Sequence, residues 1–134
     1  MKLKKLILFT FLFCSVSVLI HGQTEGKLQD EIVVATRNGD SGQLSQYFND
    51  RIELVLPGQS GVYSREQARF LVKDFFDSHP PVSFQVIHQG VRENATFAIG
   101  RYHFNTGQFR ILFLTKRAGD KTLIHQIRVE RQDD

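Results

Sequence analysis

Five side chains could bind a ligand, four in the predicted strands of the C-terminal half and one just before a predicted helix. They are His88, Arg101, His103, Arg110 and Tyr63. Near neutral pH a histidine can act as a base or as a ligand donor, and an arginine can hold an anion through paired N–H bonds. These residue types predict a site for a small apolar or anionic molecule.

His88 is the most informative of the five. It follows Phe84 and Val86 at a spacing of two, which places the three on one strand face and predicts that His88 points into the core. There it could serve as a base or contact a ligand. The alternative is a structural role, in which the imidazole bonds a backbone carbonyl near Gly90, because buried polar groups are generally satisfied.

The other four residues also have structural alternatives. Arg101 and Arg110 could clamp an anion inside a cavity, or could rest their stems on apolar neighbours at the sheet surface. His103 shares a predicted strand face with Arg101 and has the same two alternatives. Tyr63 could line the mouth of a cavity, or could pack against the helix that follows it as a hydrophobic staple.

Catalysis has less support than binding. The carboxylates that could act as a general base fall on polar faces or near strand ends: Asp50, Glu53, Asp74, Asp77 and Glu130. No acid or nucleophile stands beside His88, so a lyase or hydrolase that uses it ranks behind a non-enzymatic role. No cofactor is expected. Three histidines, His88, His103 and His125, could meet on neighbouring strands, but without a short-range ligand motif we expect no metal site.

The first 22 residues have the pattern of a secretory signal peptide. Three lysines precede an apolar run over residues 6–20, which is shorter than a membrane-spanning helix usually needs. We expect cleavage near Gly22, one domain over residues 23–134, and a periplasmic or extracellular location without a lasting membrane anchor. An uncleaved anchor is the alternative, because Ile20 stands where a small residue is usual.

The charge balance argues against a nucleic-acid partner. The chain has 17 basic and 14 acidic residues, and cleavage after residue 22 removes three basic residues and no acidic ones. The remaining domain has no net charge, so it lacks the attraction on which nucleic-acid binding depends. Cleavage also removes Cys14, the single cysteine, which excludes both a disulfide and a thiol nucleophile.

The N-terminal half predicts two short helices and a strand. Apolar residues at helical spacing over residues 27–37 end at Asn38-Gly39, where the glycine can adopt the left-handed conformation of a helix end. Ser41 can cap a second short helix. Ile52, Leu54 and Leu56 alternate with Glu53 and Val55 as on one face of a strand, and Pro57-Gly58 ends that strand.

A longer helix and four strands follow. Ser64 and Gln67 form a capping box, and Pro80-Pro81 ends the helix that it begins. Beyond it the apolar period changes to two, with polar links of two to four residues between runs. The predicted strands span residues 82–91, 95–105, 108–117 and 122–131. Short links join antiparallel neighbours, so we expect an α+β fold of order α-α-β-α-β-β-β-β.

The predicted sheet is apolar on both faces. On one strand Phe109, Ile111 and Phe113 alternate with Leu112 and Leu114. A sheet with one face in water should alternate between apolar and polar residues. Something must therefore cover the second face, which makes a homodimer through the outer sheet face the alternative to small-molecule binding.

These motifs resemble, over nearly all of the predicted domain, a family of exported Bacteroidota proteins catalogued as domain of unknown function 4783, within the nuclear transport factor 2-like or cystatin-like superfamily. The resemblance rests on Ile32–Arg37, Gly39-Asp40, Tyr47-Phe48, Ile52–Leu56, Val62–Ala68, Phe75-Phe76, His88-Gln89-Gly90, Ala98-Ile99-Gly100, Phe109-Arg110-Ile111 and Leu123–Glu130.

The resemblance implies a cone, in which a curved antiparallel sheet wraps around a long helix and often encloses a pocket. Related cones include isomerases and dehydratases, which need a carboxylate inside the cone. No acidic residue of this chain falls clearly on a buried face. We therefore expect a non-enzymatic domain that binds a small molecule inside the cone, with the homodimer as the alternative.

Overall fold

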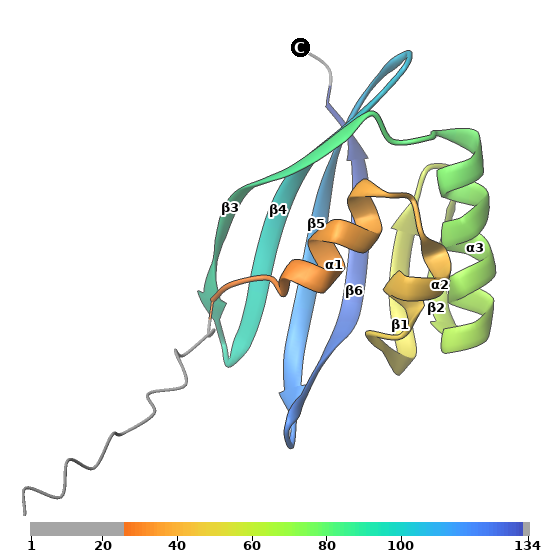
Figure 1. The fold of residues 1–134 in the computed structure, drawn as a ribbon. Helices are drawn as coiled ribbons and strands as arrows, with labels where there is room; N and C mark the ends of the chain where they lie inside the picture. Colours follow the sequence, from red (N-terminus) through yellow and green to blue (C-terminus); the bar gives the residue numbers. More distant parts are fainter. Residues whose placement is uncertain (1–25, 133–134) are drawn as a thin grey trace, which may run out of the picture.

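Residues 26–132, which the computed structural model describes, form three helices and a curved six-stranded sheet (Figure 1). The helices are α1 (Asp30–Arg37), α2 (Ser41–Ser45) and α3 (Arg65–Ser78). The strands are β1 (Phe48–Leu56), β2 (Gln59–Ser64), β3 (Ser83–Arg92), β4 (Ala95–Phe104), β5 (Gly107–Ala118) and β6 (Lys121–Arg131). The predicted α+β class is confirmed, with one strand more than expected. No helix among the described residues is long and apolar enough to cross a membrane.

Helices α1 and α2 begin and end near the residues that the sequence predicted, but a different residue caps α2. Gly39 has a φ of 62° just after α1, the left-handed conformation that glycine adopts without strain. Asp40, and not the predicted Ser41, is the N-cap of α2, and its side chain accepts a hydrogen bond from the Gln43 amide at 2.9 Å. Asp40 holds the cap because its backbone is extended, whereas Ser41 is already helical.

Helix α3 begins and ends as predicted. Ser64 is its N-cap and accepts a hydrogen bond from the Gln67 amide at 3.3 Å. Its buried side chains are Ala68, Val72, Phe75 and Phe76. The helix ends at Ser78, and His79 follows with a non-helical backbone before Pro80.

Strand β2 was missed by the sequence analysis. Pro57-Gly58, interpreted as the end of an isolated strand, is the turn of a β-hairpin, with Gly58 at a φ of 78°. Residues 59–64 pair antiparallel with β1 from Leu56↔Gln59 to Arg51↔Ser64. The strand carries little apolar alternation because it lies at the edge of the sheet and is mostly exposed.

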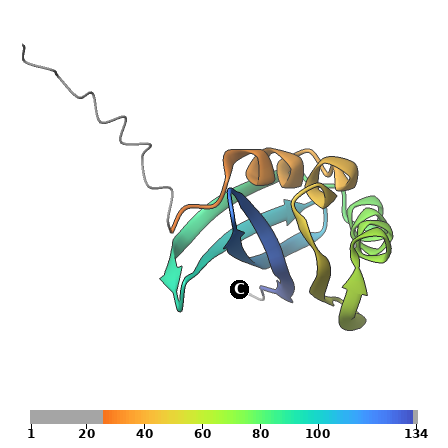
Figure 2. The ribbon, with the colours of Figure 1, turned by 90° about the horizontal axis from the view of Figure 1, so that it is seen from below.

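The strand order is β2-β1-β6-β5-β4-β3. β1 pairs with β6 in parallel, and every other neighbouring pair is antiparallel. All three helices lie on one side of the sheet, which curves around them (Figure 2). We call this side the inner face and the opposite side the outer face. Side chains alternate between the two faces along each strand, so the pairing register decides which residues face the helices.

Aromatic rings fill the space between α3 and the inner face. The Phe75 ring centroid lies 5.5 Å from that of Tyr102 and 5.4 Å from that of Phe109. The Tyr102 hydroxyl donates a hydrogen bond to the carbonyl oxygen of His79, just beyond the end of α3. Burial raises the pKa of the Tyr102 phenol, so the group stays protonated and remains a donor. These contacts fix the C-terminal end of α3 to the C-terminal part of β4.

Close packing at Gly100 predicts the effect of a single methyl group. A Cβ at this position would lie 2.2 Å from Cε2 of Phe84, whose ring is 2% exposed and cannot swing away. We expect Gly100→Ala to lower the free energy of unfolding by about 1–3 kcal/mol, measured by urea denaturation. The effect should shrink in a Phe84→Leu background, where the ring is absent. Gly42→Ala is the matched control, because its Cβ makes only ordinary contacts.

Candidate functional site

The middle of the cone has no room for a ligand. The cavity enclosed by Val72, Phe75, Phe76 and Phe113 with their neighbours has a volume of only about 10 Å³, which is the space of a single water molecule. Phenylalanine and tyrosine rings occupy that centre, so a pocket within the cone, as the sequence predicted, would have to lie toward the ends of the inner layer. The larger hollows of the described residues lie on the outer face and around the edges of the inner layer.

One large hollow lies on the outer face of the sheet. It has a volume of about 570 Å³, and the apolar side chains on its floor are Phe97 and Ile99 of β4 with Leu112 and Leu114 of β5. Polar side chains surround them: His88, Arg92, Glu93, Lys116 and Gln126. We call this region the outer hollow. The four apolar side chains are each only partly buried, and all three helices lie on the other side of the sheet (Figure 2).

His88 lies on the outer face and is exposed, so the prediction that it points into the core was wrong. Val86 pairs with Gly100 but His88 pairs with Ile99, which leaves Ile87 as an extra residue in β3. Such a β-bulge reverses the alternation beyond it. His88 instead lies beside Phe97, with ring centroids 5.5 Å apart.

Arg101 and Arg110 are direct partners on neighbouring strands, and Arg110 is in turn the partner of Glu130. The three residues form one row across the outer face, at the end of the outer hollow. The Nε atom of Arg101 is buried and has no hydrogen-bond partner among the described residues. Glu130 lies 3.7 Å from Arg128, a long contact between half-exposed side chains. The row therefore carries charges of both signs with little internal pairing.

The structure separates the remaining two predicted site residues. His103 follows Arg101 on the outer face near the end of β4 and is exposed. Tyr63 lies on β2 opposite Ile52 and packs against the hydrophobic core. Four of the five residues thus share the outer face, while Tyr63 belongs to the inner layer.

His125 is an extra residue in β6, because Leu114 pairs with Gln126 and Thr115 with Ile124. Burial, together with the nearby charge of Lys116, lowers the pKa of its imidazole below the usual value.

Within residues 26–132 no three His, Cys, Asp or Glu side chains come close enough to hold a metal ion. The three histidines considered for such a site are distributed over β3, β4 and β6.

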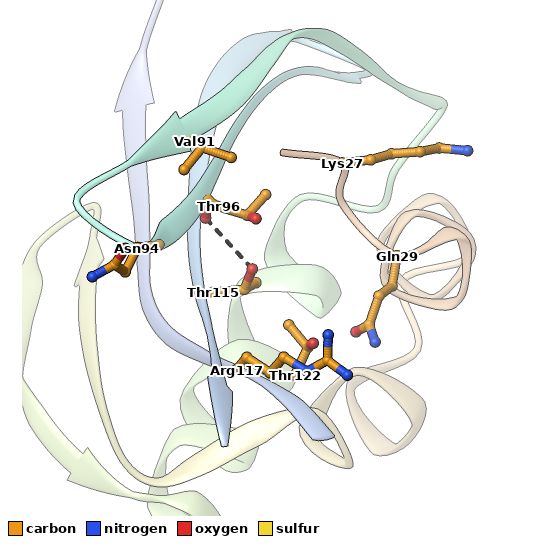
Figure 3. Close-up of a pocket in the computed structure, with 9 residues that line it drawn as sticks. Lys27, Gln29, Val91, Asn94, Thr96, Thr115, Arg117 and Thr122 are labelled. Atoms are coloured by element: carbon orange, nitrogen blue, oxygen red, sulfur yellow. Dashed lines mark hydrogen bonds between the residues drawn. The ribbon is translucent and has the colours of Figure 1, made fainter. Parts of the chain in front are cut away.

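A second space lies at the opposite side of the sheet, between the start of α1 and the inner faces of β4 to β6 (Figure 3). We call it the open-end cavity. It has a volume of about 160 Å³, and its polar lining residues are Lys27, Gln29, Asn94, Thr96, Thr115, Arg117 and Thr122. The Oε1 atom of Gln29 is buried in the described structure and has no hydrogen-bond partner there.

Sequence reasoning missed this cavity because no local pattern predicts it. Thr96 is 19 residues from Thr115 along the chain and 70 residues from Gly26, whose amide donates to its hydroxyl at 3.1 Å. The signal that was available is the run of polar residues at inner-face positions of β5 and β6, Thr115, Arg117 and Thr122, where apolar residues would be expected.

A family model described as a domain of unknown function, DUF4783, matches residues 29–130. A DUF4783 protein from Bacteroides ovatus has 30% sequence identity and a TM-score of 0.76, covering 81% of this chain and 99% of that chain. One from Bacteroides fragilis has 32% identity and a TM-score of 0.74, covering 78% and 99%. No curated protein matches the chain.

More distant structures show the same fold. A protein of the NTF2-like family from Streptomyces avermitilis has a TM-score of 0.57 at 12% identity, covering 78% of this chain and 92% of that chain. At this identity the likeness concerns the arrangement of the helices and strands alone. It confirms the nuclear transport factor 2-like fold that the sequence motifs implied.

The bulge at Ile87 predicts a role for Gln89, which it turns to the inner face. Gln89 Oε1 accepts a hydrogen bond from the amide of buried Leu28 at 2.9 Å. We expect Gln89→Ala to lower the free energy of unfolding by about 1 kcal/mol and to speed hydrogen exchange at the Leu28 amide. Gln85→Ala is the control and should change neither quantity, because Gln85 is as exposed as Gln89 but lies on the outer face, opposite Arg101. Equal effects of the two substitutions would contradict the register described here.

Proposed function

The chain belongs to the DUF4783 family and has an NTF2-like fold, and from its outer face we propose that it is a protein–protein interaction module that pairs with a second copy of itself. One observation carries the proposal. The outer hollow is floored by four apolar side chains, and no helix of the described chain covers it.

The energetic reason lies in the central strands. Phe97, Ile99, Leu112 and Leu114 stand next to one another across β4 and β5 and are shielded from water only by their neighbours. Covering apolar area stabilises an assembly by roughly 25 cal/mol per Å². Large contiguous apolar patches rimmed by polar residues are typical of protein interaction sites.

The charges around the hollow favour a second copy as the partner. A two-fold dimer places the same surface on both sides, so that surface must be complementary to itself. Arg101 and Arg110 stand near Glu130 on one side of the hollow, and Lys116 stands near Glu93 on another. A rim with charges of both signs lets opposite charges meet between copies, whereas a rim of one sign would repel its own copy.

Small-molecule binding, the other function that the sequence indicated, would have to use the space that the aromatic rings leave free. The centre of the cone is filled, so the open-end cavity is the place for it in the inner layer. Export through a signal peptide is a prediction from residues 1–22, which lie outside the described residues. We propose that the dimer works outside the cytoplasm, where that signal would deliver it.

Replacing Leu112 tests the pairing. Leu112→Glu places a carboxylate in the middle of the outer hollow, where pairing would bury it without a partner. We expect the protein to be a dimer in sedimentation equilibrium and the substitution to raise the dissociation constant at least tenfold, which corresponds to about 1.4 kcal/mol.

Phe70→Glu provides the matched control. Phe70 lies on α3 on the helix side of the molecule and is 67% exposed, so the same change of chemistry there should leave the dimer intact. Circular dichroism melting of both variants separates dissociation from unfolding. A wild-type protein that stays monomeric at high concentration, or a folded Leu112→Glu protein that still pairs normally, would refute the proposal.

A further inference from the structure

We infer that the open-end cavity binds a compact organic anion that also carries an N–H or O–H donor, such as a small α-hydroxy or α-amino carboxylate. This inference goes beyond self-association and concerns the opposite side of the sheet. It rests on three properties of the cavity: its size, the charge of its wall, and a buried acceptor that nothing in the described chain satisfies.

The size sets an upper limit on the ligand. The cavity volume is about 160 Å³, and one water molecule needs about 10–15 Å³ on this measure. The space therefore holds on the order of ten water-sized groups. That suits a metabolite of a few carbon atoms and excludes a steroid, a nucleotide or a long acyl chain.

The charge of the wall favours an anion. Lys27 and Arg117 are the charged residues among those that line the cavity, and none of the lining residues is acidic. The Lys27 side chain points away from the space (Figure 3), so Arg117 supplies the positive charge at the wall. The Nε atom of Arg117 donates to the Gly119 carbonyl at 3.1 Å, which holds the side chain and leaves the terminal amino groups of the guanidinium for a ligand. Lys27 lies 3.7 Å from Asp30, but both side chains are well exposed, so this pair neutralises little of the charge.

Gln29 supplies the requirement for a donor. It stands at the N-cap of α1 but makes no capping hydrogen bond, and its Oε1 atom is buried without a partner among the described residues. A buried acceptor left unpaired costs about 1–3 kcal/mol. Figure 3 shows the Gln29 amide and the Arg117 side chain directed toward the same space. A hydroxyl or ammonium group on the ligand would satisfy the amide oxygen while its carboxylate meets the guanidinium.

The threonines fit the same ligand. The Thr96 hydroxyl oxygen accepts the Gly26 amide at 3.1 Å, which leaves its proton free to donate to a carboxylate oxygen. Thr115, which is 2% exposed, donates to the Thr96 carbonyl at 3.5 Å and stands at the base of the cavity. Thr122 adds a further hydroxyl on β6, beside Arg117 on β5. The wall thus offers the Thr96 hydroxyl proton and the Arg117 amino groups to the anion, and the buried Gln29 oxygen to its hydroxyl or amino group.

A titration followed by amide NMR tests the ligand class with four defined probes. Lactate and alanine have both the carboxylate and the donor, acetate lacks the donor, and lactamide lacks the charge. We expect lactate or alanine to shift the amide signals of Thr96, Thr115 and Thr122, with dissociation constants at least tenfold lower than those of acetate and lactamide.

Two variants assign the contacts. Arg117→Gln should weaken binding of the better probe at least tenfold, because it removes the charge at an exposed position. Gln29→Met keeps the shape of the side chain but removes the acceptor, so it should abolish the preference over acetate and leave acetate binding unchanged. Arg131→Gln, a loss of charge at the end of β6 outside the cavity, is the control and should alter neither value.

The titration reports on the open-end cavity, whereas the Leu112→Glu experiment reports on the outer hollow. Either proposal can therefore fail while the other stands. Lactamide binding as well as lactate would show that the anion is not recognised and would overturn the inference. So would a lack of shifts at the three threonine amides with every probe at tens of millimolar. A Gln29→Met protein that still prefers the hydroxy acid to acetate would remove the role of the amide oxygen.

Discussion

The hydrogen bond from the Tyr102 hydroxyl to the His79 carbonyl is the contact on which the layer arrangement depends. It joins the fully buried Tyr102 side chain of β4 to His79, the partly exposed residue that follows α3. Around it the rings of Phe75, Phe76 and Phe109 pack at centroid distances of 5.4–6.4 Å from their partners. Because these rings hold the helix against the sheet, they also close the cone. Binding spaces can then exist only where the aromatic cluster ends.

The alternation of side chains along the strands decides what those spaces contain. In β4, Phe97 faces the outer hollow and Thr96 faces the open-end cavity. In β5, Leu114 faces the outer hollow and Thr115 faces the open-end cavity. Two β-bulges, at Ile87 and at His125, change the alternation near one end of the sheet. The apolar character of one face and the polar character of the other therefore come from the same short stretches of chain.

This shared construction links the two proposed sites physically. Ala95 lines both spaces and is almost fully buried between them. A movement of β4 at this end of the sheet would displace the wall of the cavity and the floor of the hollow together. Interiors packed this closely transmit strain from one side of a sheet to the other, so the proposed partner on the outer face and the proposed ligand in the cavity would act on the same strands.

The sequence by itself determined the α+β class, helix α3 with its Ser64 cap, and the four C-terminal strands, because caps, prolines and the apolar period act over a few residues. It also placed His103 on the same strand face as Arg101, and the structure shows that this is the outer face. That Arg110 of the next strand joins them there follows only from the pairing of β4 with β5. Strand β2 escaped prediction because an exposed edge strand needs no apolar alternation.

Only the tertiary structure decided which face His88 occupies and whether the cone is open. The bulge at Ile87 exists in the pairing of β3 with β4 and leaves no local sequence signature. The filling of the cone depends on rings from α3, β4 and β5 that meet across long sequence separations. The open-end cavity likewise joins Gln29 to Thr96 and Arg117. Spacing along a strand fixes the order of side chains, whereas pairing and packing fix what each one meets.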